Sequence, residues 1–92
     1  MSTETLEPDI DLDVSLDELF TYSLILWNDD HNSFDNVIRA LTTIVGHTTE
    51  QATQCAFIAH TKGQCQVKEG DYDDMVRLKQ GLNDYGLEAT VK

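Results

Sequence analysis

The stretch Tyr22–Val37, YSLILWNDDHNSFDNV, carries the clearest structural signals of this chain. Residues 22–27 alternate between two sets of β-forming side chains and contain no breaker, which predicts a strand. The strand is followed by Asn28, Asp29 and Asp30, short polar residues that favour turns because their side chains hydrogen-bond to nearby backbone. From about residue 33 the apolar spacing becomes helical, and one face carries Phe34, Val37, Ile38, Leu41 and Val45. The stretch therefore predicts a strand and a helix joined by an acidic turn.

Capping residues divide the rest of the chain into further elements. Asn32 or Ser33 is a suitable N-cap for the first helix, which Gly46 should end, and Thr48 with Gln51 has the form of a capping box for the second. The expected elements are a strand at 22–27, a helix at 33–45, a helix at 49–61, a strand at 64–68, a helix from 72 to 85 and a strand at 87–91. This order predicts an α+β fold, a small two-layer sandwich with a three-stranded antiparallel sheet against three helices.

Apolar residues at helical spacing identify the inward faces of the second and third helices. The second helix should bury Ala52, Cys55, Ala56 and Ala59, and its three alanines permit a close approach or leave a hollow. Cys55 and the strand residue Cys65 are expected to be buried or half-buried thiols. The inward residues of the third helix are expected to be Tyr72, Met75, Leu78 or Lys79, Leu82 and Tyr85.

The net charge of −11 is concentrated at the start of the 92-residue chain. Residues 1–20 contain seven acidic residues and no Lys or Arg, which predicts a flexible acidic extension before a core domain at 21–92. Acidity disfavours nucleic acid and anionic membrane surfaces as partners. A chain of this size is too small to enclose a large cofactor, and none is expected. Without a membrane-length apolar run or a signal-like N-terminus, we expect a cytoplasmic location.

His60 is the second residue that can carry chemistry. It follows Ala56 by one turn, near the expected inner face and just before the second helix ends. On position alone a capping or core role is the more common one for such a histidine. If His60 meets the turn at residues 28–30, however, the imidazole, amide and carboxylate groups form a cluster of acceptors suited to an ammonium group.

Three segments together resemble the ClpS adaptor family: YSLILWNDDHNSFDNVI, TTEQATQCAFIAHTKGQCQV and the terminal LEATV. The resemblance spans about residues 21–92. It implies an adaptor, not an enzyme, that binds N-end rule substrates by their first residue. It also implies delivery of these substrates to a Clp AAA+ unfoldase of ClpA or ClpC type.

The resemblance assigns roles to particular residues. It implies that the free α-amino group of the substrate is held by Asn28, Asp29, Asp30 and His60. It implies that a Leu, Phe, Tyr or Trp side chain enters a hydrophobic pocket formed by Leu26, Asn32, Phe34, Val37, Ala56, Ala59 and Leu87. Docking to the unfoldase falls on the third helix, at Tyr72, Asp73, Arg77 and Lys79.

This chain departs from the family pattern at three places. Ser33 stands where many members have Pro, and Phe34 stands where a Met often guards the pocket. In the third helix the family has a Glu and, five residues later, a Lys; here these positions are Asp73 and Leu78. A stiff Phe34 ring should exclude β-branched Val and Ile.

Two other functions remain alternatives. A metal site or hydrolase would use His31, His60, Asp29 and Asp30, but no HExxH or Cys/His motif supports it. A Cys55–His60 nucleophile pair is disfavoured because residues five apart lie about 140° apart around a helix. A structural interaction module, such as a ribosomal stalk-type domain, would need no acidic turn facing His60.

Overall fold

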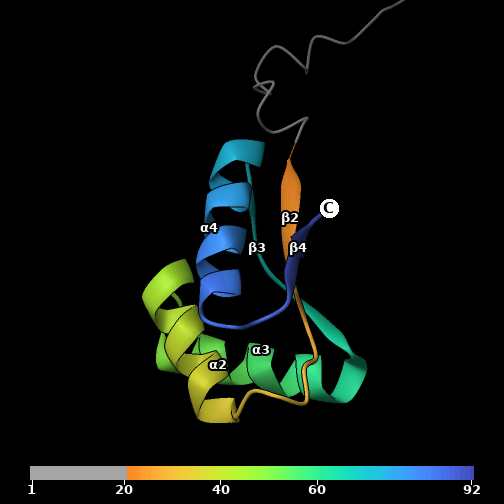
Figure 1. Ribbon diagram of the computed structural model, residues 1–92. Helices are drawn as coiled ribbons and strands as arrows, with labels where there is room; N and C mark the ends of the chain where they lie inside the picture. Colours follow the sequence, from red (N-terminus) through yellow and green to blue (C-terminus); the bar gives the residue numbers. More distant parts are fainter. Residues whose placement is uncertain (1–20) are drawn as a thin grey trace, which may run out of the picture.

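The computed structural model describes residues 21–92, and the predicted acidic extension at 1–20 lies outside the described residues. The elements in order are β2 (Tyr22–Trp27), α2 (Phe34–Ala40), η2 (Leu41–Val45), α3 (Thr49–Lys62), β3 (Gln64–Gly70), α4 (Tyr72–Asp84) and β4 (Ala89–Val91). Figure 1 shows α4 alongside the strands, with α2 and α3 together at one end of the molecule. The predicted α+β class with a three-stranded antiparallel sheet and three helices is confirmed.

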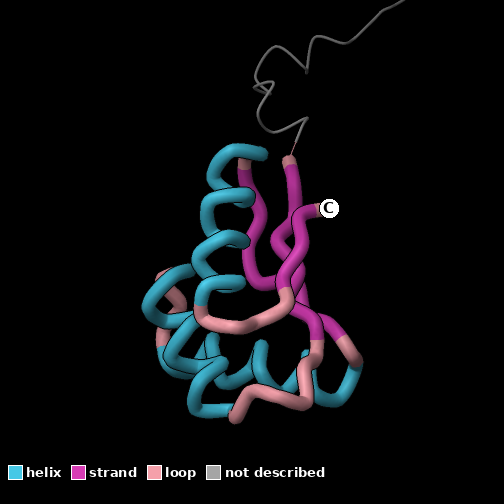
Figure 2. The backbone as a smooth tube through the Cα atoms, in the orientation of Figure 1, coloured by secondary structure: helices cyan, strands magenta, loops and turns pink. Residues whose placement is uncertain are grey.

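The central strand of the sheet is β2, which pairs antiparallel with β3 on one side and β4 on the other. Leu26 lies opposite Cys65 and Ala89, and all three are buried. A bulge interrupts the β2–β3 register between Leu24 and Ile25. Figure 2 shows the loop that leaves β2 at the end of the sheet where the helices gather.

The core lies between the inner face of the sheet and the helices. Its largest fully buried side chains are Leu24, Leu26, Leu41, Met75 and Leu82. The two thiols follow the prediction, because Cys65 is buried and Cys55 is half-buried.

Side-chain caps set the starts of the helices. The Ser33 hydroxyl accepts a hydrogen bond from the Asn36 amide, 3.1 Å away, so Ser33 rather than Asn32 caps α2. Thr48 and Gln51 form both halves of the predicted capping box. These contacts satisfy backbone donors that a helix start leaves free.

The helix predicted at 33–45 is observed at residues 34–45, but its last part is π-helical and not α-helical. An α-helix ends at Ala40 and a π-helical turn, η2, follows, in which the Gly46 amide donates to the Leu41 carbonyl, 3.1 Å away. This wider turn places Ile44 against Gly81 of α4, where a Cβ would lie 2.8 Å from the Ile44 Cγ2 atom. A glycine is found here inside a helix because the Ile44 side chain occupies the space that a Cβ atom of residue 81 would need.

The ends of two strands also differ from the prediction. β3 continues to Gly70, because Tyr22 and Ser23 pair with Gly70 and Glu69. β4 begins only at Ala89. Leu87 is buried, but its amide donates back to the Leu82 carbonyl at the end of α4, so it cannot join the sheet there.

Tyr72 was expected on the inward face of its helix, and this expectation is wrong. The side chain is 54% exposed. Its ring meets Tyr22 edge to face, with centroids 5.1 Å apart. Tyr72 is the first residue of α4, beyond the part of the helix that Met75 and Leu82 bury in the core.

Candidate functional site

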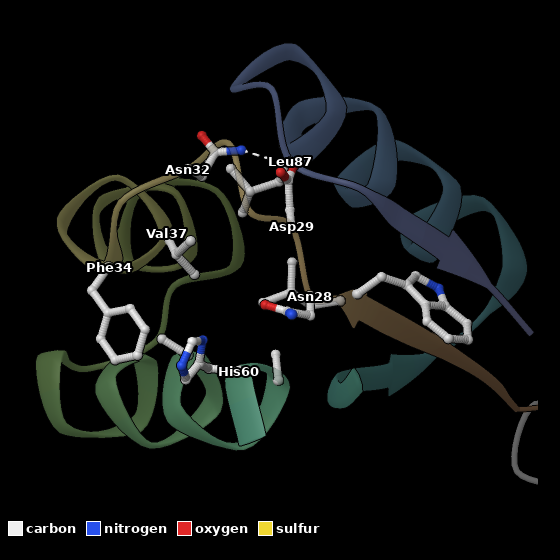
Figure 3. A pocket seen from close by; sticks show the side chains of 11 residues that line it. Asn28, Asp29, Asn32, Phe34, Val37, His60 and Leu87 are labelled. Atoms are coloured by element: carbon white, nitrogen blue, oxygen red, sulfur yellow. Dashed lines mark hydrogen bonds between the residues drawn. The ribbon is translucent and has the colours of Figure 1, made fainter. Parts of the chain in front are cut away.

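A pocket opens where the turn after β2 meets α2, α3 and the segment before β4 (Figure 3). It contains about 360 Å³ of empty space, part of which is open solvent. Its lining residues are Leu26, Trp27, Asn28, Asp29, Asn32, Phe34, Val37, Ala56, Ala59, His60 and Leu87. In Figure 3, Phe34 and His60 lie next to each other on one side of the cavity, and Asn28 and Asp29 lie across from them.

The Asp29 carboxylate is oriented by the turn that contains it. One oxygen accepts from the His31 amide at 2.7 Å, and the other accepts from the Asn32 side-chain amide at 3.0 Å. Asn32 Nδ2 also donates to the Gly86 carbonyl at 2.8 Å, which ties the turn to the chain just before Leu87. An ionised carboxylate has about four acceptor positions, so Asp29 keeps acceptor capacity for a further donor.

Asn36 supports this turn from α2. Its Nδ2 donates to Asn32 Oδ1 at 2.6 Å and lies 3.4 Å from the Tyr85 carbonyl. Asn36 was not among the predicted site residues, although its place one helical turn after Asn32 is a usable signal. Asn36 therefore positions Asn32 and, through Asn32, the carboxylate of Asp29.

Asn28 is brought to the end of α3 by the backbone. Its amide donates to the carbonyl of Gly63 at 2.9 Å. Gly63 ends α3 in the left-handed conformation, with φ 94°, which glycine adopts without the cost that other residues incur. This link brings Asn28 to the same pocket as His60, which lies three residues before Gly63 in α3.

His60 was predicted to lie near the inner face of its helix, but it is exposed. Ala56 and Ala59 occupy the buried stripe of α3, so the next residue is turned about 100° toward the pocket rim. The His60 ring meets Phe34 edge to face, with centroids 5.5 Å apart and an interplanar angle of 78°. The two rings therefore form one side of the pocket entrance.

The inner wall of the pocket is apolar. Leu26, Ala56, Ala59 and Leu87 are buried, whereas Phe34 is 41% exposed at the rim. The two alanines leave room between α3 and the sheet, so the hollow that the sequence permitted is the one observed. An apolar hollow beside carboxylate, amide and imidazole groups can hold a cation attached to an apolar side chain.

The structure brings together most of the predicted site residues. All seven predicted side-chain pocket residues line the cavity, as do Asn28, Asp29 and His60. Asp30 is exposed and lies outside the lining, so the geometry gives no support to the predicted contact of Asp30 with an amino group. Trp27 lines the pocket and was not predicted to do so.

The residues predicted to dock on an unfoldase lie on α4, outside the pocket lining. Tyr72, Asp73 and Arg77 are exposed, and Lys79 is half-buried. The Arg77 guanidinium pairs with Asp74 at 3.0 Å.

For the metal alternative, the structure of residues 21–92 contains no group of three His, Cys, Asp or Glu side chains that could hold an ion. In the same residues no helix has both the length and the apolar character of a membrane span.

The chain matches a family model described as ATP-dependent Clp protease adaptor protein ClpS over residues 17–90. The chain belongs to the ClpS family. It is 28% identical over 92 residues to the ATP-dependent Clp protease adapter protein ClpS of Corynebacterium diphtheriae, covering 100% of this chain and 81% of that protein. It is 32% identical over 68 residues to the ClpS protein of Streptomyces avermitilis, covering 74% of this chain and 65% of that protein.

A solved structure supports the fold of this ClpS protein. Agrobacterium tumefaciens ClpS2 bound to L-phenylalaninamide matches with a TM-score of 0.77 at 20% identity, over 79% of this chain and 95% of the other. The predicted family is confirmed, and ClpS proteins are adaptors of the Clp protease rather than proteases.

Proposed function

We propose that this ClpS protein binds the free N-terminal Leu, Phe, Tyr or Trp of N-degron substrates and delivers them to a Clp AAA+ unfoldase of ClpA or ClpC type. The observation that supports this most strongly is that Asn28, Asp29 and His60 line the same pocket as the residues of the apolar hollow. The solved ClpS2 structure, whose ligand is an amino acid amide, agrees with this choice of ligand.

The α-amino group of the substrate is assigned to the polar side of the pocket. An ammonium group offers donors only, and Asp29, Asn28 and neutral His60 each offer an acceptor. Each charge-assisted hydrogen bond contributes about 1.5–3 kcal/mol. Asp29 contributes the negative charge among these lining residues.

The first side chain of the substrate is assigned to the hollow between α2, α3 and Leu87. Burying a Leu or Phe side chain contributes about 1.5–3 kcal/mol. Lost rigid-body freedom and peptide ordering cost several kcal/mol, so the two halves together give an affinity on the order of micromolar. A free terminus and a large apolar side chain are therefore both required.

Entry to the hollow passes the rings of Phe34 and His60. If the first residue of the substrate were branched at its Cβ atom, the branch would lie between these rings, next to the bound amino group. Leu and the aromatic residues are unbranched at Cβ, and their bulk lies deeper in the hollow. The pocket should therefore reject Val and Ile.

Delivery is assigned to surfaces outside the pocket. The α4 residues Tyr72, Asp73, Arg77 and Lys79 are proposed to dock on the unfoldase. The acidic segment 1–20 is proposed to take part in the transfer of the substrate.

Fluorescence anisotropy with labelled peptides that differ only in their first residue tests the binding. Peptides that begin with Leu, Phe, Tyr or Trp should bind at least tenfold more tightly than one that begins with Val. Equal affinity for the Leu and Val peptides would contradict the proposal.

A further inference from the structure

Trp27 lines the pocket, but neither the proposed amino site nor the proposed side-chain site uses it. It is the last residue of β2, and its side chain is 38% exposed. The indole Nε1 donates to the Thr90 hydroxyl of β4 at 2.9 Å, which holds the ring against the neighbouring strand. A large apolar surface that is already held in one orientation loses little conformational entropy when a ligand covers it.

The alternation of side chains along β2 directs this ring away from Leu26, which lines the inner wall of the hollow. Leu26 points inward and lines the hollow, so Trp27, the next residue, points to the opposite face of the sheet. Thr90 on β4 shares that face, because it follows the buried Ala89. The helices pack on the other face, which leaves the indole accessible.

An extended peptide has the same alternation. If its first side chain enters the hollow and its amino group meets Asn28 and Asp29, its second side chain points the opposite way. Consecutive Cα atoms are only about 3.8 Å apart, so the second residue leaves the pocket beside the end of β2. The second side chain of the peptide then points the same way as the Trp27 ring.

We propose that Trp27 and Thr90 form a second subsite, which receives the second residue of the peptide and favours a large apolar side chain there. The subsite rests on the proposed function, because the amino site and the hollow set where the peptide begins. An apolar second side chain would be partly buried against the indole ring. This burial should increase the affinity of the peptide about fivefold relative to a peptide with glycine at that position.

Two labelled peptides that begin with Leu and differ only in Gly or Ile at the second residue test this subsite. For the native protein the Ile peptide should bind about fivefold more tightly. In Trp27→Ala this ratio should fall below twofold, whereas Trp27→Phe should keep most of it. Using the ratio of two affinities removes any general loss of binding or stability in a variant.

The protein has one tryptophan, so its fluorescence gives a second measurement. At saturation the Ile peptide should shift the Trp27 emission to shorter wavelength more than the Gly peptide does. Equal affinities of the two peptides for the native protein, or an unchanged ratio in Trp27→Ala, would overturn the subsite. Failure of both peptides to bind the native protein would instead overturn the proposed function, so the two failures can be told apart.

Discussion

Asp29 and Asp30 are neighbours with the same side chain, but the turn uses them differently. Asp29 lines the pocket, and both its oxygens accept hydrogen bonds from within the turn. Asp30 is exposed and lies outside the lining. The two residues thus form a matched pair for separating a direct contact from the general effect of acidic charge.

Replacing Asp29 with Asn should weaken binding of a Leu-initiated peptide at least tenfold, because a charge-assisted hydrogen bond becomes a neutral one. Asp30→Asn removes the same charge and should cost less than threefold, because a solvated charge acts weakly through water. Anisotropy titrations of both variants provide the comparison. Similar losses in the two variants would mean that charge alone, and not contact, accounts for the effect.

Cys65 provides a prediction about pH. Burial, assisted by the neighbouring Cys55 thiol, raises the pKa of Cys65 from 9.0 to about 12. Above pH 9 the unfolded chain loses this proton while the folded chain keeps it. The free energy of unfolding should therefore decrease as pH rises from 9 toward 12, whereas below pH 9 this contribution is constant.

Urea unfolding at pH 8 and pH 10.5 measures this effect. Between these values the native protein should lose on the order of 1–2 kcal/mol more stability than Cys65→Ala, which lacks the thiol. Tyrosines and lysines titrate in both proteins, so the difference isolates Cys65. Equal losses in the two proteins would show that the thiol titrates normally.

The contact between η2 and α4 depends on Gly81. A methyl group at this position would meet Ile44 at 2.8 Å. Alanine normally stabilises a helix by about 1 kcal/mol relative to glycine. Overpacking costs about 1–3 kcal/mol, so Gly81→Ala should have a small or destabilising effect instead of the usual gain.

The double variant Gly81→Ala with Ile44→Ala separates these two effects. Once Ile44 is shortened, the added methyl group has space, and Gly81→Ala should then stabilise the protein by about 1 kcal/mol relative to Ile44→Ala alone. Thermal or urea unfolding of the four proteins measures the coupling. Gly81→Ala with the same effect in both backgrounds would contradict the proposed close contact.

The elements themselves were largely predictable because their signals are local. Alternation in β2, the Thr48–Gln51 capping box and the helix-ending Gly46 and Gly63 each depend on residues close together in the chain. The π-helical turn was not predictable, since it depends on how Ile44 meets α4. The exposure of Tyr72 likewise depends on where the core ends, which periodicity within one helix does not show.

The pocket is formed by segments that are far apart in the chain. Spacing alone could not show that His60 lines the same pocket as Asn28 and Asp29, or that Leu87 belongs to it. The family resemblance supplied that arrangement, and the seven predicted side-chain pocket residues do line one cavity. It did not supply Trp27 or Asn36, whose positions depend on contacts with Thr90 and Asn32.

Binding and delivery are assigned to different surfaces, so they should be separable. Arg77→Glu reverses an exposed charge on α4 and should slow Clp-dependent degradation of a Leu-initiated substrate severalfold, with little change in peptide affinity. Lys68→Glu makes the same charge change at an exposed position of β3 and serves as the control. Equal degradation rates for the native protein and Arg77→Glu would exclude this residue from docking.

In the proposed function one pocket binds both the free amino group and the side chain of the first residue. Acetylating the α-amino group tests this joint recognition, since acetylation removes the positive charge and two donors while the side chain stays the same. We predict that a labelled peptide beginning with Leu binds with about micromolar affinity and that its N-acetylated form binds at least a hundredfold more weakly. Equal affinity for the two peptides would contradict this joint recognition.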